Sequence, residues 1–97
     1  MNVALRPGAE ADVAAAYQYY AEADADLAEE FVDELDRLLQ RLSLFPRSAQ
    51  PVEGYEGVRR GLLRRFPFAA FYVLGENKIA VLRVLHTARS PEEGPGA

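Results

Sequence analysis

The sequence predicts an α+β domain in which a helical hairpin packs on one face of a small, mainly antiparallel sheet. Three observations predict it: a short alternating segment at the N-terminus, two stretches of helical periodicity, and three apolar alternating segments after them. The order is therefore β-α-α-β-β-β, and two packed layers are the simplest arrangement that buries the apolar faces of these elements. The 97 residues fit one domain, placed at residues 1–91, with residues 92–97 expected to form a disordered tail.

The first strand and the first helix adjoin at a Pro-Gly pair. Asn2–Arg6, with the sequence NVALR, alternates apolar and polar residues and ends before Pro7. Ala9–Ala21 is rich in alanine, which favours a helix. Apolar and aromatic side chains recur there at helical spacing, at Val13, Ala16, Tyr17 and Tyr20.

The strongest predicted element is a second, amphipathic helix of about 20 residues. Its apolar positions repeat every three or four residues: Ala28, Phe31, Leu35, Leu38, Leu42 and Phe45. Two starts are consistent with the sequence, either Asp24 as N-cap or Asp26 with Glu29 as a capping box. Pro46 ends the helix because proline cannot continue it.

Three further strands follow a loop at residues 46–57. Val58–Arg64 is the first, with Gly61 as a candidate bulge. Pro67–Leu74 and Lys78–His86 are the second and third, joined by a hairpin turn at residues 75–77.

Both faces of the predicted sheet are apolar. In the second of the three strands, one face carries Phe68, Ala70, Tyr72 and Leu74, and the other carries Ala69, Phe71 and Val73. In a regular third strand, Arg83 shares a face with Ile79, Val81 and Leu85, and His86 shares the other with Ala80, Leu82 and Val84. Two helices cover only one face. Either loops, the tail and arginine stems cover the second face, or it binds a partner chain or a second copy, which we prefer.

Charge and composition exclude several function classes. The net charge is −4, with ten acidic and three basic residues in 1–45 and five acidic and eight basic residues in 46–97. An acidic chain is a poor general binder of nucleic acid, so no direct nucleic-acid binding is expected. There is no cysteine, no metal-ligand spacing, no phosphate loop and no long apolar run. We therefore expect no metal, no cofactor, no membrane contact and a cytoplasmic location.

The segment RVLHTARSP contains the only histidine, His86, between two arginines. A nuclease site would need His86 as acid or base with a cation such as Arg59 or Arg89. In a regular strand Arg83 points to the opposite face from His86. The alternative is that His86 ends a strand and bonds to backbone, and that the arginines at 59, 60, 64 and 65 form a solvated face paired with the acidic helix.

The element order and three segments together resemble the RelE/ParE superfamily of toxins from bacterial type II toxin–antitoxin systems. The segments are LSLFPRSAQPV, GVRRGLLRRFPFAAFYVL and IAVLRVLHTARSP, and the resemblance spans roughly residues 3–91. In that superfamily the RelE-like branch cleaves messenger RNA in the ribosome, whereas the ParE-like branch inhibits DNA gyrase and is not a nuclease. Both branches are neutralised by an antitoxin whose C-terminal segment wraps the toxin.

The resemblance favours the ParE-like branch. RelE-like nucleases similar to this chain carry an arginine at the position of Ala69 and a tyrosine near the chain end, where His86 is here followed by Thr87. The resemblance thus implies a gyrase inhibitor, with a RelE-like endoribonuclease or a member that only binds its antitoxin as alternatives. It implies a cognate antitoxin, ParD-like or other, as partner, and a homodimer or a heterotetramer with antitoxin as assembly.

The resemblance also suggests which residues make contacts. If the second sheet face is open, the antitoxin is expected at Phe71, Val73, Leu82 and Val84. Polar contacts to the target or to antitoxin acids are expected at Arg59, Arg60, Arg83 and Arg89. No catalytic residue is assigned; only in a nuclease would His86, Arg59 and Arg89 be candidates.

Overall fold

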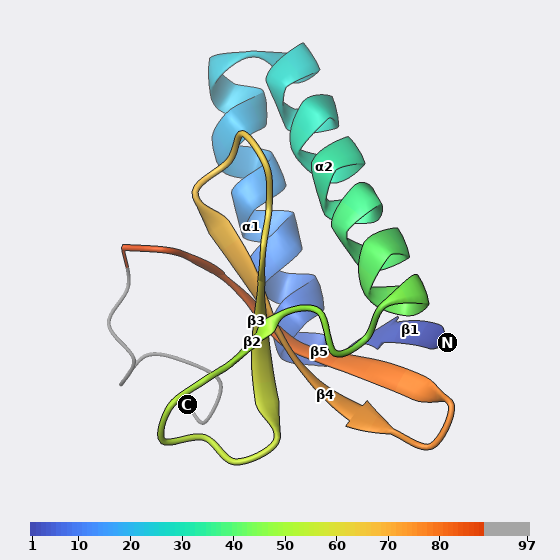
Figure 1. Cartoon of the computed structure of the whole chain (residues 1–97). Coiled ribbons are helices and arrows are strands. Elements are labelled where there is room, and N and C mark those ends of the chain that lie inside the picture. The colour runs from blue at the N-terminus through green and yellow to red at the C-terminus, as the bar shows by residue number, and fades with distance from the viewer. Residues whose placement is uncertain (89–97) are drawn as a thin grey trace.

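The computed structural model describes residues 1–88, in which two helices pack on a five-stranded mixed sheet (Figure 1). The elements are β1 Asn2–Leu5, α1 Pro7–Ala23, α2 Ala25–Leu44, β2 Gln50–Pro51, β3 Val58–Leu62, β4 Phe68–Gly75 and β5 Lys78–His86. The strand order is β1-β5-β4-β3-β2, with β1 parallel to β5 and the other pairs antiparallel. The predicted fold class is confirmed. The predicted tail at 92–97 lies outside the described residues.

One aspartate both ends α1 and starts α2. The backbone N–H of Asp24 donates to the carbonyl of Tyr20 (2.9 Å), and its carboxylate accepts from the N–H of Asp26 (2.8 Å). Asp24, rather than Asp26, is therefore the N-cap of α2. This shared cap keeps the connection to a single residue, so the helices form a hairpin.

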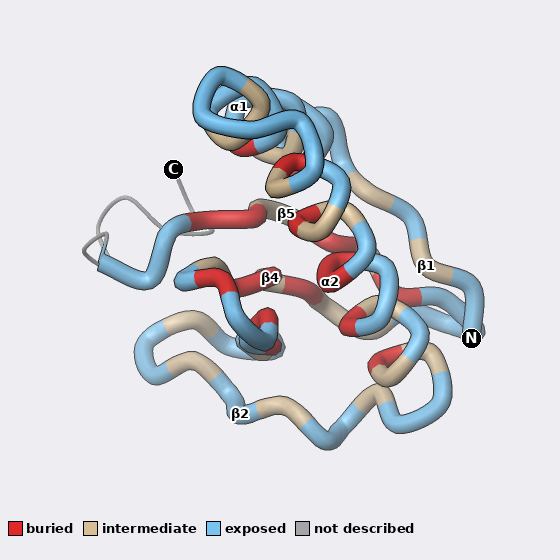
Figure 2. Tube along the Cα trace, turned by 90° about the horizontal axis from the view of Figure 1, so that it is seen from above, coloured by how far each residue is buried: buried red, intermediate tan, exposed pale blue. Residues whose placement is uncertain are grey.

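The helices cover the sheet face that carries Tyr72, and the core lies between them. Buried residues are concentrated in β4, β5 and the side of α2 that lies over them (Figure 2). The largest fully buried side chains are Tyr72, Phe31, Leu42, Ile79, Val81 and Val84. Neither helix of residues 1–88 covers the second face of the sheet, which carries Phe71 and Val73. Neither of the helices in residues 1–88 has the length and hydropathy that a membrane-spanning helix needs.

Tyr72 supports the loop after α2 from inside the core. Its hydroxyl donates to the carbonyl of Pro46 (2.8 Å), and burial raises the pKa of Tyr72 above its usual 10.0. We expect Tyr72→Phe to lower the free energy of unfolding by about 1 kcal/mol at neutral pH because one hydrogen bond is lost. Urea unfolding of the two proteins measures the difference.

The same pair tests the pH dependence. Because the folded pKa of Tyr72 is raised, the stability it contributes is complete below pH 10 and is lost as the pH rises above it. The stability advantage of wild type over Tyr72→Phe should therefore shrink above pH 10. A constant difference across that range would contradict this assignment.

Gly61 is not a bulge, contrary to the prediction from sequence. It pairs with Ala70 in an uninterrupted β3–β4 register. A Cβ at this position would lie 3.2 Å from Cδ1 of Leu38. The glycine is thus explained by the close approach of α2 to β3.

The irregularity lies instead between β4 and β5. Phe71 pairs with Arg83 and Tyr72 with Val81, so Leu82 is an extra residue in β5. The extra residue shifts the alternation after it. Val84 consequently faces the helices and is 1% exposed, instead of sharing the second face with Leu82 as predicted.

Candidate functional site

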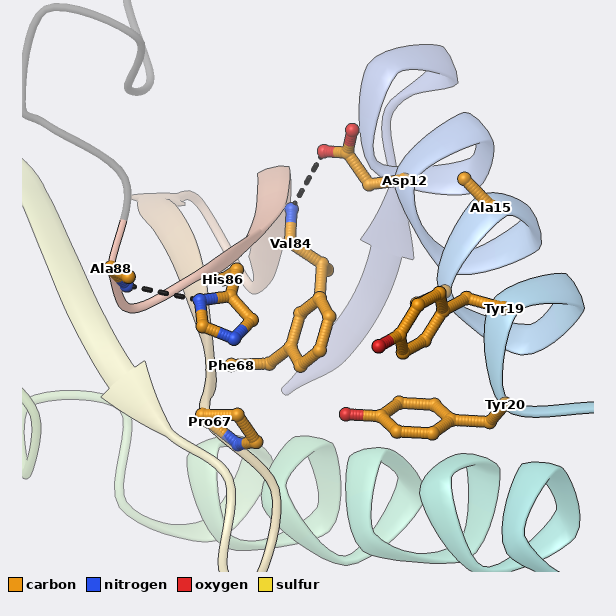
Figure 3. Close-up of a pocket in the computed structure, with 10 residues that line it drawn as sticks. Asp12, Ala15, Tyr19, Tyr20, Pro67, Phe68, Val84, His86 and Ala88 are labelled. Atoms are coloured by element: carbon orange, nitrogen blue, oxygen red, sulfur yellow. Dashed lines mark hydrogen bonds between the residues drawn. The ribbon is translucent and has the colours of Figure 1, made fainter. Parts of the chain in front are cut away.

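A groove of about 870 Å³ separates α1 from the end of β5 (Figure 3). One wall is a stripe along α1 formed by Asp12, Ala15, Ala16, Tyr19 and Tyr20. The other wall comes from the start of β4 and the end of β5, with Pro67, Phe68, Val84, His86 and Ala88. The stripe follows helical spacing, so the groove runs along about 12 Å of α1.

The groove exists because β1 is shorter than β5. β1 pairs with β5 only from Lys78 to Val81, and the chain then leaves the sheet to begin α1. From Val84 onward, the described part of β5 has no strand on this side. Ala15 and Ala16 have side chains too small to fill the space that remains.

Asp12 joins α1 to this free edge of β5. Its carboxylate accepts from Nε of Arg83 (2.7 Å), from a terminal nitrogen of Arg83 (3.0 Å) and from the backbone N–H of Val84 (2.9 Å). Only 14% of the Asp12 side chain and 23% of the Arg83 side chain are exposed. The Asp12 carboxylate raises the pKa of Arg83, and the two opposite charges neutralise each other. Gly8 permits this contact, since a Cβ there would lie 3.2 Å from Cδ of Arg83.

Tyr20 and Phe68 line the groove and belong to an aromatic cluster that continues into the core. The ring of Tyr20 lies 5.5 Å from Phe31, 5.1 Å from Phe66 and 6.2 Å from Phe68, measured between centroids. Burial raises the pKa of Tyr20 and the nearby Tyr19 adds to the effect, so its hydroxyl is protonated at neutral pH. Tyr19 stands at the rim and is 70% exposed. Both tyrosines project from α1 toward Phe68 and His86 (Figure 3). The groove therefore offers apolar surface with two hydroxyl groups.

His86 ends β5 beside this cluster and is bonded to backbone. Its ring packs edge-on against Phe68 at 5.4 Å, and its Nδ1 accepts the backbone N–H of Ala88 (3.1 Å). Arg83 pairs with Phe71 on the second face, whereas His86 pairs with Phe68 on the helix side. The two side chains therefore do not meet.

Arg59 does not reach His86 either. It pairs with Tyr72, four residues along β4 from the partner of His86, which is about 13 Å of strand. Its guanidinium donates to the carbonyls of Arg47 (3.1 Å) and Ala49 (2.8 Å). Within residues 1–88 the structure thus brings no cation to His86, and Arg89 lies outside the described residues. In the same part of the chain, no three histidine, aspartate or glutamate side chains cluster as metal ligands would.

The other predicted contact residues are spread over several surfaces. Phe71, Val73 and Leu82 are half-buried and pack outside the core, whereas Val84 belongs to the core and lines the groove. Arg60 is exposed. Arg65 pairs with Glu30 of α2 (3.4 Å), which agrees with the alternative prediction that these arginines form a solvated face paired with the acidic helix.

Sequence reasoning missed Asp12, Ala15 and Tyr19. The signal was present as the spacing of residues 12, 15, 16, 19 and 20 along one helix. It was hidden because small and aromatic residues on a helix usually face a core. The sheet register explains why this part of the stripe is not covered: β1 pairs with β5 only as far as Val81.

Comparisons with known proteins agree with this fold. Residues 3–91 match the family model described as the ParE toxin of the type II toxin–antitoxin system parDE. The solved structure of a chromosomal ParDE toxin–antitoxin system from P. aeruginosa is similar, with a TM-score of 0.76 and 25% sequence identity. The similarity covers 89% of this chain and 95% of that chain. No curated protein matches. With a family model that matches nearly its whole length, the chain belongs to the ParE toxin family of type II toxin–antitoxin systems.

Proposed function

We propose that this ParE-type toxin arrests growth by binding DNA gyrase and that a cognate antitoxin neutralises it. The observation that carries the proposal is the state of His86, whose ring packs on Phe68 and whose Nδ1 accepts a backbone N–H. General acid–base catalysis needs a second titratable or cationic group within hydrogen-bond reach. Within residues 1–88, no acidic or cationic side chain hydrogen-bonds to His86, which favours action by binding over cleavage of RNA.

The middle strand supports the same conclusion. Ala69 stands where similar RelE-like nucleases carry an arginine, and it is 1% exposed. The neighbouring cations are committed elsewhere, Arg59 to two backbone carbonyls and Arg83 to Asp12. Neither Arg59 nor Arg83 is therefore free to stabilise the charge that develops on a phosphate during RNA cleavage.

The groove is the surface we assign to the antitoxin. Its aromatic side chains and its free strand edge suit a segment that buries apolar side chains. A segment that leaves the groove across the edge of β5 reaches the second face, where Phe71, Val73 and Leu82 remain proposed contacts. The similarity to the solved ParDE system of P. aeruginosa supports an antitoxin partner.

Incorporation of radiolabelled precursors after induction of this chain alone tests the function. We expect thymidine incorporation to fall first while leucine incorporation continues, and we expect the purified toxin to inhibit supercoiling by gyrase. An early fall in leucine incorporation would instead indicate a ribosome-dependent nuclease. Co-expression of the antitoxin should abolish either effect.

His86→Ala separates the two activities in the same assay. A gyrase inhibitor should keep its full activity, because the substitution removes only one ring contact and one backbone hydrogen bond. In a nuclease, loss of a general acid or base lowers the rate by about 100-fold or more. The time course of growth arrest, measured at matched toxin levels, distinguishes the two results.

A further inference from the structure

The C-terminal end of α2 exposes two large apolar side chains in succession. Leu44 is 73% exposed and Phe45 is 65% exposed. Leu44 is the last residue of α2 and Phe45 is its C-cap. This end of α2 lies beside β1 (Figure 1), and the amino group of Met1 donates to the carbonyl of Ser43 (3.1 Å). Neighbouring exposed apolar side chains of this size on a folded surface are typical of an interaction site.

The backbone of Phe45 is fixed by three hydrogen bonds. Its N–H donates to the carbonyl of Arg41 (2.8 Å). Its own carbonyl accepts from the backbone N–H of Ser48 (3.0 Å) and from the Ser48 hydroxyl (2.7 Å). An aromatic ring on a fixed backbone loses little conformational freedom when a partner covers it, which is a property of strong interface anchors.

The charge of α2 changes sign before this end. Residues 25–36 contain six acidic and no basic residues, whereas residues 37–50 contain three arginines and no acidic residue. Arg37 is paired with Glu34 (2.6 Å), but the guanidinium groups of Arg41 and Arg47 have no partner within residues 1–88. We name Arg41, Leu44, Phe45 and Arg47 the α2-end surface.

A hollow of about 260 Å³ adjoins this surface. It lies between α2, which contributes Arg41, and β3, which contributes Arg60 and the half-exposed Leu62. The guanidinium of Arg60 likewise has no partner in the part of the chain that the structure describes. Two unpaired guanidinium groups around one hollow are suited to a carboxylate, which arginine binds through paired hydrogen bonds.

We propose that the α2-end surface binds an acidic, partly apolar segment of the toxin's protein target, with Phe45 as anchor and Arg41, Arg47 and Arg60 facing its carboxylates. An acidic protein segment is the partner whose charge is opposite to that of the arginines on this surface. A second copy would bring the same arginines against one another, and a nucleic acid would leave the aliphatic Leu44 unburied on a chain of net charge −4. The proposal rests on the proposed function in that the toxin acts by binding a protein.

This surface and the groove are separate. The groove is lined by α1 from Asp12 to Tyr20, the start of β4 and the end of β5, whereas the α2-end surface lies at the C-terminal end of α2, and no residue is common to both. A segment held in the groove does not contact Phe45. Substitutions in the α2-end surface should therefore affect the target and spare the antitoxin.

Phe45→Glu and the double variant Arg41→Glu/Arg47→Glu test the proposal in the full-length chain. We expect both variants to lose growth arrest at an induction level at which wild type arrests growth. Their dissociation constants for the purified antitoxin, measured by calorimetry, should stay within about threefold of wild type. Arg64→Glu, the same type of substitution at an exposed arginine outside this surface, should arrest growth normally.

Three outcomes would overturn the proposal. Both variants could remain toxic, or they could lose antitoxin affinity while staying toxic, which would assign the surface to the antitoxin. Wild type could bind a synthetic DNA duplex that Phe45→Glu no longer binds, which would assign the surface to nucleic acid. The failure of this proposal is distinguishable from the failure of the proposed function. A wild-type toxin that stops protein synthesis contradicts the gyrase proposal, whereas a Phe45→Glu variant that inhibits gyrase as strongly as wild type contradicts this one.

Discussion

Asp12→Ala is expected to lower the free energy of unfolding by about 2–3 kcal/mol. The carboxylate accepts two hydrogen bonds from Arg83 and one from the N–H of Val84, and its removal leaves a largely buried guanidinium without its counter-charge. Urea unfolding followed by circular dichroism measures the loss. Glu22→Ala, an exposed acid on the same helix, should change stability by less than about 0.5 kcal/mol.

A double variant isolates the cause. Asp12→Ala/Arg83→Met removes the unpaired cation as well, so it should be more stable than Asp12→Ala alone. If the double variant lost the sum of the two single losses, Asp12 and Arg83 would not be coupled, and the account of this ion pair would be wrong.

Ala15→Arg is expected to weaken antitoxin binding by about 100-fold or more, equivalent to about 2.7 kcal/mol. Ala15 is exposed and lies in the α1 wall between Asp12 and Tyr19, so a long side chain fills the groove without disturbing the core. Arginine is also nearly as good a helix former as alanine, and the fold should be retained. Calorimetry with the purified antitoxin measures the affinity.

Ala14→Arg is the matched control for the groove. Ala14 is exposed on the same helix but lines no part of the groove. This variant should bind antitoxin with wild-type affinity. Equal affinities for the Ala14 and Ala15 variants would show that the antitoxin does not use the groove.

Periodicity predicted the helices and the four longer strands because each buries one regular stripe or face. The α2 stripe through Phe31, Leu35, Leu38 and Leu42 is buried as predicted. β2 was missed because it has only two residues, Gln50 and Pro51, which are too few to show an alternation of apolar and polar side chains. The bulge at Leu82 was missed because an extra residue in an all-apolar strand leaves the apolar pattern unbroken.

The candidate site was less predictable, because it depends on the length of one strand relative to another. His86 was correctly considered as a strand-end residue bonded to backbone. The groove beside it follows from the point at which β1 stops pairing with β5. Asp12 lies 71 residues from Arg83 in the chain, and no local pattern indicates that they pair.

The place of β5 in the sheet governs when a newly synthesised chain can fold. β5 is synthesised last among the described strands, yet it lies between β1 and β4. Asn2 therefore has no strand partner until Lys78 has been synthesised. Closing so long a loop is slow, and it cannot begin until that segment has left the ribosome. Chains that terminate before residue 78 lack both the neighbour of β1 and the part of the groove that β5 forms. A nascent chain therefore cannot complete the sheet, or the β5 side of the groove, until residues 78–88 have left the ribosome.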